Sequence, residues 1–205
     1  DWWPAMHARL EREQLTRLLG FGWPLVFGGV ASWGLSTMDR VFLRSMSTYD
    51  ELGVYSVAAS MAAAVTIFAG IFNIIWSPMV YRWVANKADM SRVDAIAVQM
   101  TVLAFMLVCI AGGSSWVLRY LLPSAYANVQ YIIVGCIVSP LLYTLSEVTG
   151  IGIAVTRRTA YSLYASLGAV ILNIGLCYLL VPQLGATGAM IANVCAFGLF
   201  FLLRT

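Results

Sequence analysis

"TAYSLYASLGAVILNIGLCYLLVPQLGATGAMIANVCAFGLFFLL", residues 159–203, contains no charged side chain. One crossing of a bilayer needs about 20 apolar residues, so a run of this length predicts two crossings. The segment "VPQLGATG", residues 181–188, separates them, because Pro182 cannot continue a helix and Gly185 and Gly188 loosen the chain that follows. We therefore expect a pair of membrane helices at about 159–181 and 185–203.

Four more segments of the chain are long and apolar enough to cross a bilayer, at about 18–43, 52–81, 95–118 and 126–155. The 205 residues are 61% hydrophobic and 10% charged, whereas soluble domains carry about 25% charged residues. The expected fold class is all-α, a polytopic membrane protein with six transmembrane helices. Binding to nucleic acid is not expected, because no basic stripe interleaves with exposed aromatic residues.

The connecting segments alternate in charge, which predicts the orientation of the chain in the membrane. If the N-terminus is cytoplasmic, the inner segments hold nine basic residues and the outer ones three. The inner set is Arg9, Arg12, Arg17, Arg82, Lys87, Arg92, Arg157, Arg158 and Arg204, and the outer set is Arg40, Arg44 and Arg119. Both termini are therefore expected in the cytoplasm. Residues 1–17 are either a short interfacial helix or a frayed polar lead-in, and both interpretations stay open.

Chemistry of the kinds found in enzymes and metalloproteins has no signature in this sequence. The four cysteines lie in apolar runs without CxxC spacing, and His7 is the single histidine. The motifs HExxH and GxSxG are absent, as is a glycine-rich loop in a strand–helix context. We expect no metal site, no cofactor and no enzymatic activity.

"LSTMDRVFLRSM", residues 35–46, places three charges at the end of the first predicted helix. Asp39 and Arg40 are adjacent and so do not face each other on a helix, whereas Arg40 and Arg44 share one face. Two arginines on one face suit a phosphate or diphosphate. Asp39 lies roughly 33 Å along the helix when counted from Arg17, at the far interface, but roughly 22 Å along when counted from Pro24, inside the membrane. A plain interfacial charge and a role in a polar pathway both remain open.

Three further polar residues lie deep in apolar segments. Glu147 is an intramembrane carboxylate, which suggests a cavity or a proton path; the alternative is a structural pair with an arginine of another helix. Pro140, seven residues earlier, lies near the same face and frees a backbone carbonyl. Asn73 and Asn173 are candidates for the same pathway, although buried asparagines in membranes often serve only to join helices.

The order of short motifs along the chain resembles a known family. The first helix begins "GFGWPLVFGGVASW" and ends "STMDRVFL", the second opens "DELGVYSVAASMAA" and closes "FNIIWSPMVYR", and the last pair carries "LNIGLCYLLVP" and "LGATGAMIANV". Together they resemble the C-terminal half of a polysaccharide-biosynthesis flippase of the O-antigen repeat-unit type. That family is similar to multidrug and toxin extrusion transporters and to lipid II flippases.

The resemblance implies one lobe of a two-lobe exporter that moves an undecaprenyl-diphosphate-linked oligosaccharide across the bacterial cytoplasmic membrane. Asp39 falls on the acidic position that ends the first helix of a lobe. The other positions that match the family's motifs are Gly53, Tyr55, Ala58, Asn173, Pro182 and Gly188. One lobe cannot enclose a cavity, so the resemblance also implies a missing N-terminal lobe or a second copy. Because the chain begins with Asp1 and stops after an apolar run, a fragment is expected.

Other functions remain open for a chain of this composition. A multidrug or small-molecule exporter has the same fold, and a non-transporting membrane scaffold needs no cavity. A membrane enzyme acting on lipid phosphates is a further alternative, but the predicted outer rim carries Asp39, Asp50 and Glu51 without a histidine.

Overall fold

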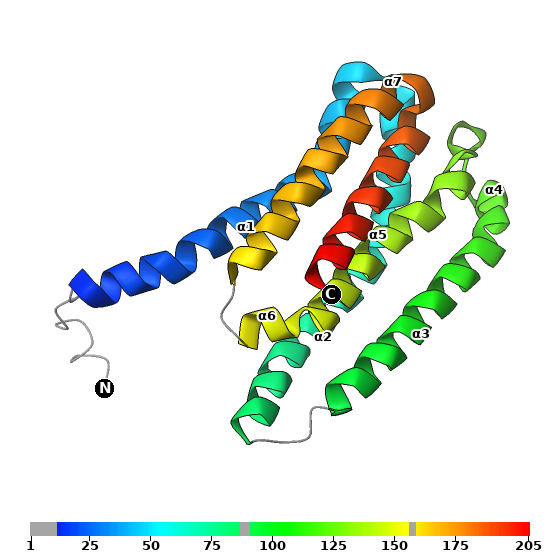
Figure 1. Cartoon of the computed structure of the whole chain (residues 1–205). Helices are drawn as coiled ribbons and strands as arrows, with labels where there is room; N and C mark the ends of the chain where they lie inside the picture. The colour runs from blue at the N-terminus through cyan, green and yellow to red at the C-terminus, as the bar shows by residue number, and fades with distance from the viewer. Residues whose placement is uncertain (1–11, 87–90, 156–158) are drawn as a thin grey trace, which may run out of the picture.

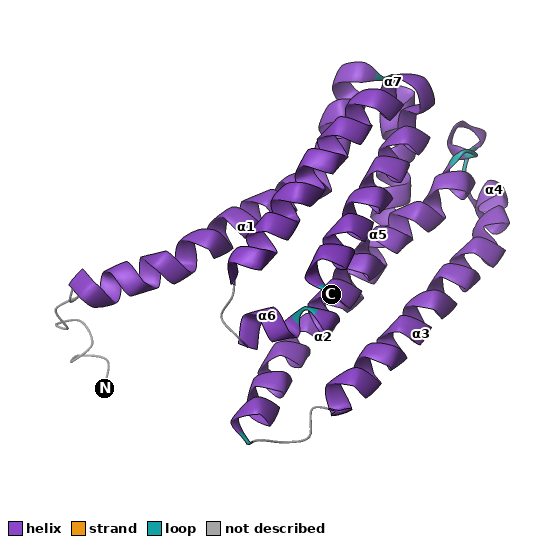
Figure 2. Ribbon diagram, viewed as in Figure 1, coloured by secondary structure: helices purple, strands orange, loops and turns teal. Residues whose placement is uncertain are grey.

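The computed structural model describes residues 12–86, 91–155 and 159–205, and these residues form helices and short connections without a strand (Figure 2). The all-α prediction is confirmed. The longer helices are α1 (Arg12–Met46), α2 (Tyr49–Ala85), α3 (Ser91–Ser114), α5 (Val129–Thr149) and α7 (Thr159–Arg204). The shorter ones are α4 (Leu118–Leu121), α6 (Ile151–Val155) and two 3-10 turns, Ser115–Val117 and Ser124–Tyr126.

Helix α7 consists of two rods that meet at Gly185, as the uncharged run predicted. Gly185 has φ 53° and ψ −128°, which lie outside the helical region and are open to glycine because it lacks a Cβ. In Figure 1 the yellow-to-orange rod rises to the label α7 and the red rod returns to the C-terminus. Gly188 packs so closely against the backbone of Leu180 that a Cβ would lie 2.5 Å from the Leu180 carbonyl oxygen. The two rods therefore form a tight helical hairpin.

Within the part of the chain that the structure describes, four helical stretches are long and apolar enough to cross a membrane. They are Tyr49–Ala85, Ser91–Leu121, Val129–Thr149 and Ala160–Arg204, the last being the α7 hairpin. Large apolar side chains face outward on them, as on Ile74 (76% exposed) and Phe105 (70% exposed). Such surfaces are solvated by lipid rather than water, so the chain is a membrane protein. The crossing by α1 stays a prediction.

Most observed helix ends lie within a few residues of the expected ones, and two differences bear on the packing. Helix α1 begins at Arg12 and runs on to Met46, so part of the predicted lead-in 1–17 belongs to it, and residues 1–11 lie outside the described residues. The fourth predicted helix, 126–155, is divided at Gly150 into α5 and α6. A Cβ at Gly150 would lie 2.6 Å from the Ser146 carbonyl oxygen and 3.2 Å from the Arg204 guanidinium nitrogen Nε. The lack of a side chain at Gly150 therefore leaves room for the Arg204 side chain at the end of α7.

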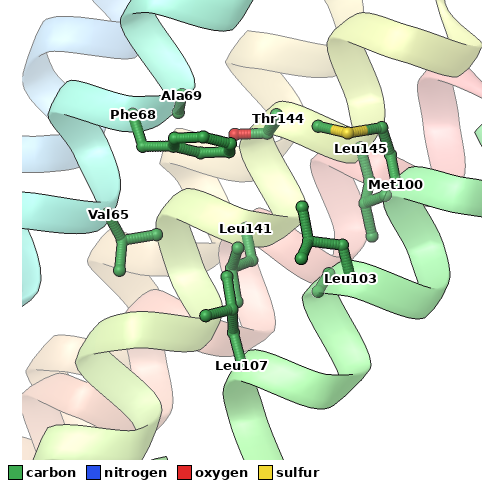
Figure 3. Close-up of a pocket in the computed structure, with 10 residues that line it drawn as sticks. Val65, Phe68, Ala69, Met100, Leu103, Leu107, Leu141, Thr144 and Leu145 are labelled. Carbon is green, nitrogen blue, oxygen red and sulfur yellow. The ribbon is translucent and has the colours of Figure 1, made fainter.

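The core of the bundle joins α1, α2, α5 and α7 through small side chains. The buried alanines Ala58, Ala189 and Ala192 lie in one cluster with Leu43 and Ile132, and small residues let membrane helices approach closely. On the other side of α5, the residues labelled in Figure 3 surround a space of only about 10 Å³ between α2, α3 and α5. That space is about the size of one water molecule and is lined almost wholly by apolar groups, so it is a packing gap rather than a ligand site.

Candidate functional site

A cavity of about 560 Å³ lies among α1, α2, α5 and α7, within the range of small-molecule binding sites. Among the described residues, its lining combines aromatic, small and polar side chains with a single charged one, Arg40. The residues that line it are Trp33, Ser36, Arg40, Tyr55, Ala59, Ala62, Ala63, Thr66, Ile67, Cys136, Ser139, Pro140, Tyr143, Asn193 and Phe197. Arg40 and Pro140, which the sequence analysis singled out separately, therefore both line this cavity.

Asp39 lies fully buried behind this wall and accepts hydrogen bonds from three other parts of the chain. The Tyr55 hydroxyl donates to Oδ2 at 2.8 Å, the Asn173 amide to Oδ1 at 3.1 Å and the Cys177 thiol to Oδ1 at 3.6 Å. The Asn193 amide also donates to Oδ2. A buried carboxylate is tolerated when such donors replace water. Asp39 thus joins α1 to α2 and to both rods of α7.

Local helix geometry brings these donors to one point. Asn173 and Cys177 are four residues apart and share one face of the first rod of α7. The turn at Gly185 then brings Asn193 back beside them from the second rod. Of the four donors, Tyr55 and Asn193 also line the cavity, whereas Asn173 and Cys177 do not. The interpretation of Asn173 as a residue that joins helices agrees with its contact to α1.

The structure separates the charges of the "MDRVFLR" segment, residues 38–44. Asp39 faces the core, Arg40 lines the cavity, and Arg44 is exposed and does not line it. In residues 12–86, 91–155 and 159–205, Arg40 has no salt-bridge partner. Arg40 is thus available to an anionic ligand, and Arg44 does not reach the same space.

Glu147 forms an ion pair with Arg204 at the end of α7. The Arg204 side chain is 10% exposed and that of Glu147 28%. Arg204 also donates to the Ser146 hydroxyl at 3.4 Å and lies 5.0 Å from the centre of the Phe200 ring. This is the structural pair with another helix that the sequence left as an alternative. Glu147 does not line the cavity.

Asn73 lies apart from the cavity and from the Asp39 group. Its side-chain oxygen is buried and lacks a hydrogen-bond partner among the described residues, as does the indole nitrogen of Trp76 one turn later. Asn73 therefore makes no interhelical bridge through its oxygen, and nothing in the structure assigns it to the pathway.

Sequence reasoning missed three residues of this region. Asn193 is an asparagine in the same uncharged run as Asn173, so the criterion that selected Asn173 also selects it. Cys177 carried no signal beyond its position four residues after Asn173. Glu51 was named only as a residue of the predicted outer rim, and its contact with α7 was not foreseen: its carboxylate accepts a hydrogen bond from the Ala186 backbone amide at 2.7 Å. It thereby caps the second rod of α7, where a helix start has free N–H groups.

A family model described as "Polysaccharide biosynthesis protein" matches residues 1–131. This chain belongs to the polysaccharide biosynthesis protein family. No curated protein and no solved structure matches the chain. The matched residues include α1, α2 and α3, and with them Asp39, Arg40 and Tyr55 of the cavity region.

Proposed function

We propose that this member of the polysaccharide biosynthesis family is a flippase that moves lipid-linked oligosaccharide repeat units across the bacterial cytoplasmic membrane. The observation that carries the proposal is a cavity inside a membrane protein of this family with Arg40 as its one charged lining residue. A guanidinium matches the oxygens of a diphosphate through paired hydrogen bonds. The substrate proposed is an undecaprenyl-diphosphate-linked oligosaccharide.

The remaining lining suits the sugar part of such a substrate. Trp33, Tyr143 and Phe197 offer aromatic faces, against which the C–H faces of sugar rings pack. The polar groups of Ser36 and Ser139 lie among them. This mixture of aromatic and small polar groups is that of a binding site rather than of a packed core.

We further propose that the cavity is closed by a second lobe or a second copy of the chain. Transporters built from repeats hold their substrate between two halves, which rock to expose it alternately. In this proposal both termini are cytoplasmic, in line with the nine-to-three distribution of basic residues, and the protein moves its substrate without chemical change. A multidrug exporter of the same fold is the less favoured function, since Arg40 repels the cationic compounds that such exporters commonly carry.

The test compares two arginines of the same helix. We expect Arg40→Glu to abolish most surface-polysaccharide output in cells that depend on this protein, because the cavity then repels the diphosphate. Arg44→Glu is the matched control and is expected to preserve output, since Arg44 does not line the cavity. Membrane abundance of each variant is measured by immunoblot. Equal output from Arg40→Glu and wild type would contradict the proposal, and drug resistance on expression would favour the exporter.

A further inference from the structure

Asp39 and Arg40 carry opposite charges on neighbouring positions of α1, but the structure turns them in different directions. Asp39 is fully buried in the core, whereas Arg40 lines the cavity. Neither residue belongs to a salt bridge within residues 12–86, 91–155 and 159–205. An uncompensated charge in a site of low polarity is costly. Two opposite charges that lie near each other lower this cost even without direct contact, because the Coulomb attraction between them acts at a distance.

The hydrogen bonds of Asp39 indicate that its carboxyl group is ionised. Its oxygens accept from the Tyr55 hydroxyl at 2.8 Å, the Asn173 amide at 3.1 Å, the Cys177 thiol at 3.6 Å and the Asn193 amide. All of these bonds run toward Asp39, whereas a protonated carboxyl group would also have to donate a hydrogen of its own. Four donors around one carboxyl group suit the negatively charged form, which only accepts.

One layer of side chains separates this carboxylate from the cavity. Tyr55 and Asn193 donate to Oδ2 of Asp39, and both also line the cavity. Tyr55 interacts electrostatically with Asp39 and with Arg40, so both charges lie near the same part of the wall. Because Asp39 is fully buried, its field is screened less than that of a surface charge. An anion that binds Arg40 therefore also meets repulsion from Asp39.

Three other acidic residues of the chain differ from Asp39 in how their charge is compensated. Glu147 is paired with Arg204 and does not line the cavity. Glu51 accepts a hydrogen bond from the start of the second rod of α7, where the helix end offers further compensation. Asp50 is exposed, so its charge is screened by the surrounding solution. Unlike these three, Asp39 is a fully buried negative charge next to the cation of the cavity.

We propose that Asp39 sets how tightly the cavity holds an anion, by acting as a fixed counter-charge to Arg40. In the empty cavity the carboxylate stabilises the guanidinium from behind the wall. When a diphosphate group binds Arg40, the same carboxylate repels that group and lowers its affinity. A transport site must release its ligand as well as bind it, and a counter-charge that the ligand cannot displace favours release. Asp39 does not line the cavity and is thus a positioning residue that acts through Arg40; the inference rests on the proposed function.

The experiment measures the binding of farnesyl diphosphate and of farnesol to the purified protein in detergent by titration calorimetry. The two probes share the prenyl chain, and only the first is charged. We expect Asp39→Asn to bind farnesyl diphosphate about tenfold more tightly than wild type, because the repulsion is removed and Arg40 remains. The affinity for farnesol is expected to stay within about twofold of wild type. A purely structural role of Asp39 predicts weaker binding, so the direction of the change separates the two roles.

The substitution Asp39→Asn is chosen because it removes the charge and keeps the shape of the side chain. An amide oxygen remains to accept from Tyr55 and Asn193, which both donate to the same oxygen of Asp39. The Asn173 amide, which donates to the other oxygen, can turn over and offer its own oxygen to the new N–H group.

Two control variants keep the buried charge. Cys177→Ala removes a donor to Asp39 that lies outside the cavity. Asp50→Asn makes the same chemical change as Asp39→Asn, but at an exposed position. Both variants are expected to bind farnesyl diphosphate within about twofold of wild type. A gain in either control as large as that in Asp39→Asn would overturn the inference, because the buried charge would not be its cause.

The wild-type protein supplies a second measurement, which decides the question if Asp39→Asn does not fold. The opposite charges of Asp39 and Arg40 leave this part of the wall without net charge, so its attraction for an anion is expected to depend weakly on salt. We expect the affinity for farnesyl diphosphate to decrease less than about threefold between about 0.05 and 0.5 M NaCl. A larger decrease would overturn the inference, because Arg40 would then act without a counter-charge.

The outcomes distinguish the role of Asp39 from the flippase proposal. Equal or weaker binding of farnesyl diphosphate by Asp39→Asn, with weaker binding by Arg40→Gln, would overturn the role of Asp39 and leave the flippase proposal standing. Equal binding by Arg40→Gln and wild type would overturn both. In cells, Asp39→Asn is expected to lower surface-polysaccharide output at wild-type membrane abundance, because a more tightly bound ligand leaves more slowly. Unchanged output from a variant with the higher affinity would overturn the link to release.

Discussion

The ion pair between Glu147 and Arg204 gives a prediction whose size follows from the burial of its two partners. Glu147→Gln leaves the Arg204 charge without its counter-ion in a site where the side chain is only 10% exposed. Arg204→Gln leaves a carboxylate that is 28% exposed and better able to reach polar surroundings. Replacing the glutamate is therefore expected to cost more stability than replacing the arginine.

The magnitude lies between two known limits. Exposed ion pairs contribute about 0.2–1 kcal/mol, and removal of one partner from a buried pair costs about 3–5 kcal/mol. With side chains 10% and 28% exposed, we expect Glu147→Gln to lower the free energy of unfolding by about 2 kcal/mol. For a chain of about this size, that corresponds to a decrease in Tm of about 4–8 °C.

The assay is thermal unfolding in detergent, monitored by size-exclusion chromatography of heated samples. It is applied to the two single variants and to the double variant Glu147→Gln/Arg204→Gln. The double variant is expected to lose less stability than the sum of the single losses, because the second substitution removes a charge that the first left unpaired. Thr205→Val, which removes the 3.0 Å contact between the Thr205 and Thr149 hydroxyls and the 3.0 Å bond from the Thr205 hydroxyl to the Phe201 carbonyl but leaves the ion pair in place, is the control for local disturbance. Losses that add to within about 0.5 kcal/mol would refute the coupling. Transport, corrected for protein amount, is expected to stay at the wild-type level in Glu147→Gln.

Three other contacts are tested by substitution, each through the Tm in detergent. Gly188→Ala is expected to lower the Tm by more than about 5 °C, because its methyl group meets helix backbone that cannot move aside. Gly175→Ala is the control and is expected to leave the Tm unchanged, because the space around Gly175 is open. Equal Tm values for the two variants would contradict the tight hairpin. Glu51→Ala is expected to lower the free energy of unfolding by about 1 kcal/mol, because the cap on the second rod of α7 is lost. The stability of Glu51→Gln is expected to lie closer to that of wild type. An unchanged Tm in both variants would show that the contact is not stabilising. Asn173→Leu is expected to cost about 1.5–3 kcal/mol because it removes a donor from the buried carboxylate of Asp39, and a gain in Tm would contradict that account.

The sequence predicted the helices well because bilayer thickness sets their length. The uncharged run 159–203 is too long for one crossing, and Pro182 with Gly185 was enough to place the turn. The division at Gly150 was not predicted, and the residue that packs on this glycine, Arg204, comes from the far end of the chain. A glycine in an apolar run looks the same whether or not another helix packs on it.

The site was harder to predict, because it depends on the depth of Asp39 in the membrane and on hydrogen-bond donors that are distant from it in the sequence. Two ways of counting along α1 gave two depths for Asp39, and the structure ends the helix seven residues beyond it, at Met46. At 1.5 Å per residue, Asp39 lies roughly 10 Å below that helix end. Its three other polar donors besides Tyr55 come from α7, which no local pattern around residue 39 reveals.

The spread of these donors along the chain has a consequence for biosynthesis. Tyr55 follows Asp39 by 16 positions, but Asn173 follows it by 134 and Asn193 by 154. At a translation rate of 5–20 residues per second, the carboxylate waits roughly 7–27 s for Asn173 after it has left the ribosome. Throughout that interval the nascent first hairpin carries an acidic group with one of its four final donors. If α1 crosses the membrane as predicted, we expect its stable insertion to be coupled to completion of the last hairpin, and ribosomes stalled before residue 173 to leave the first helix more accessible to water-soluble labels than the finished protein does.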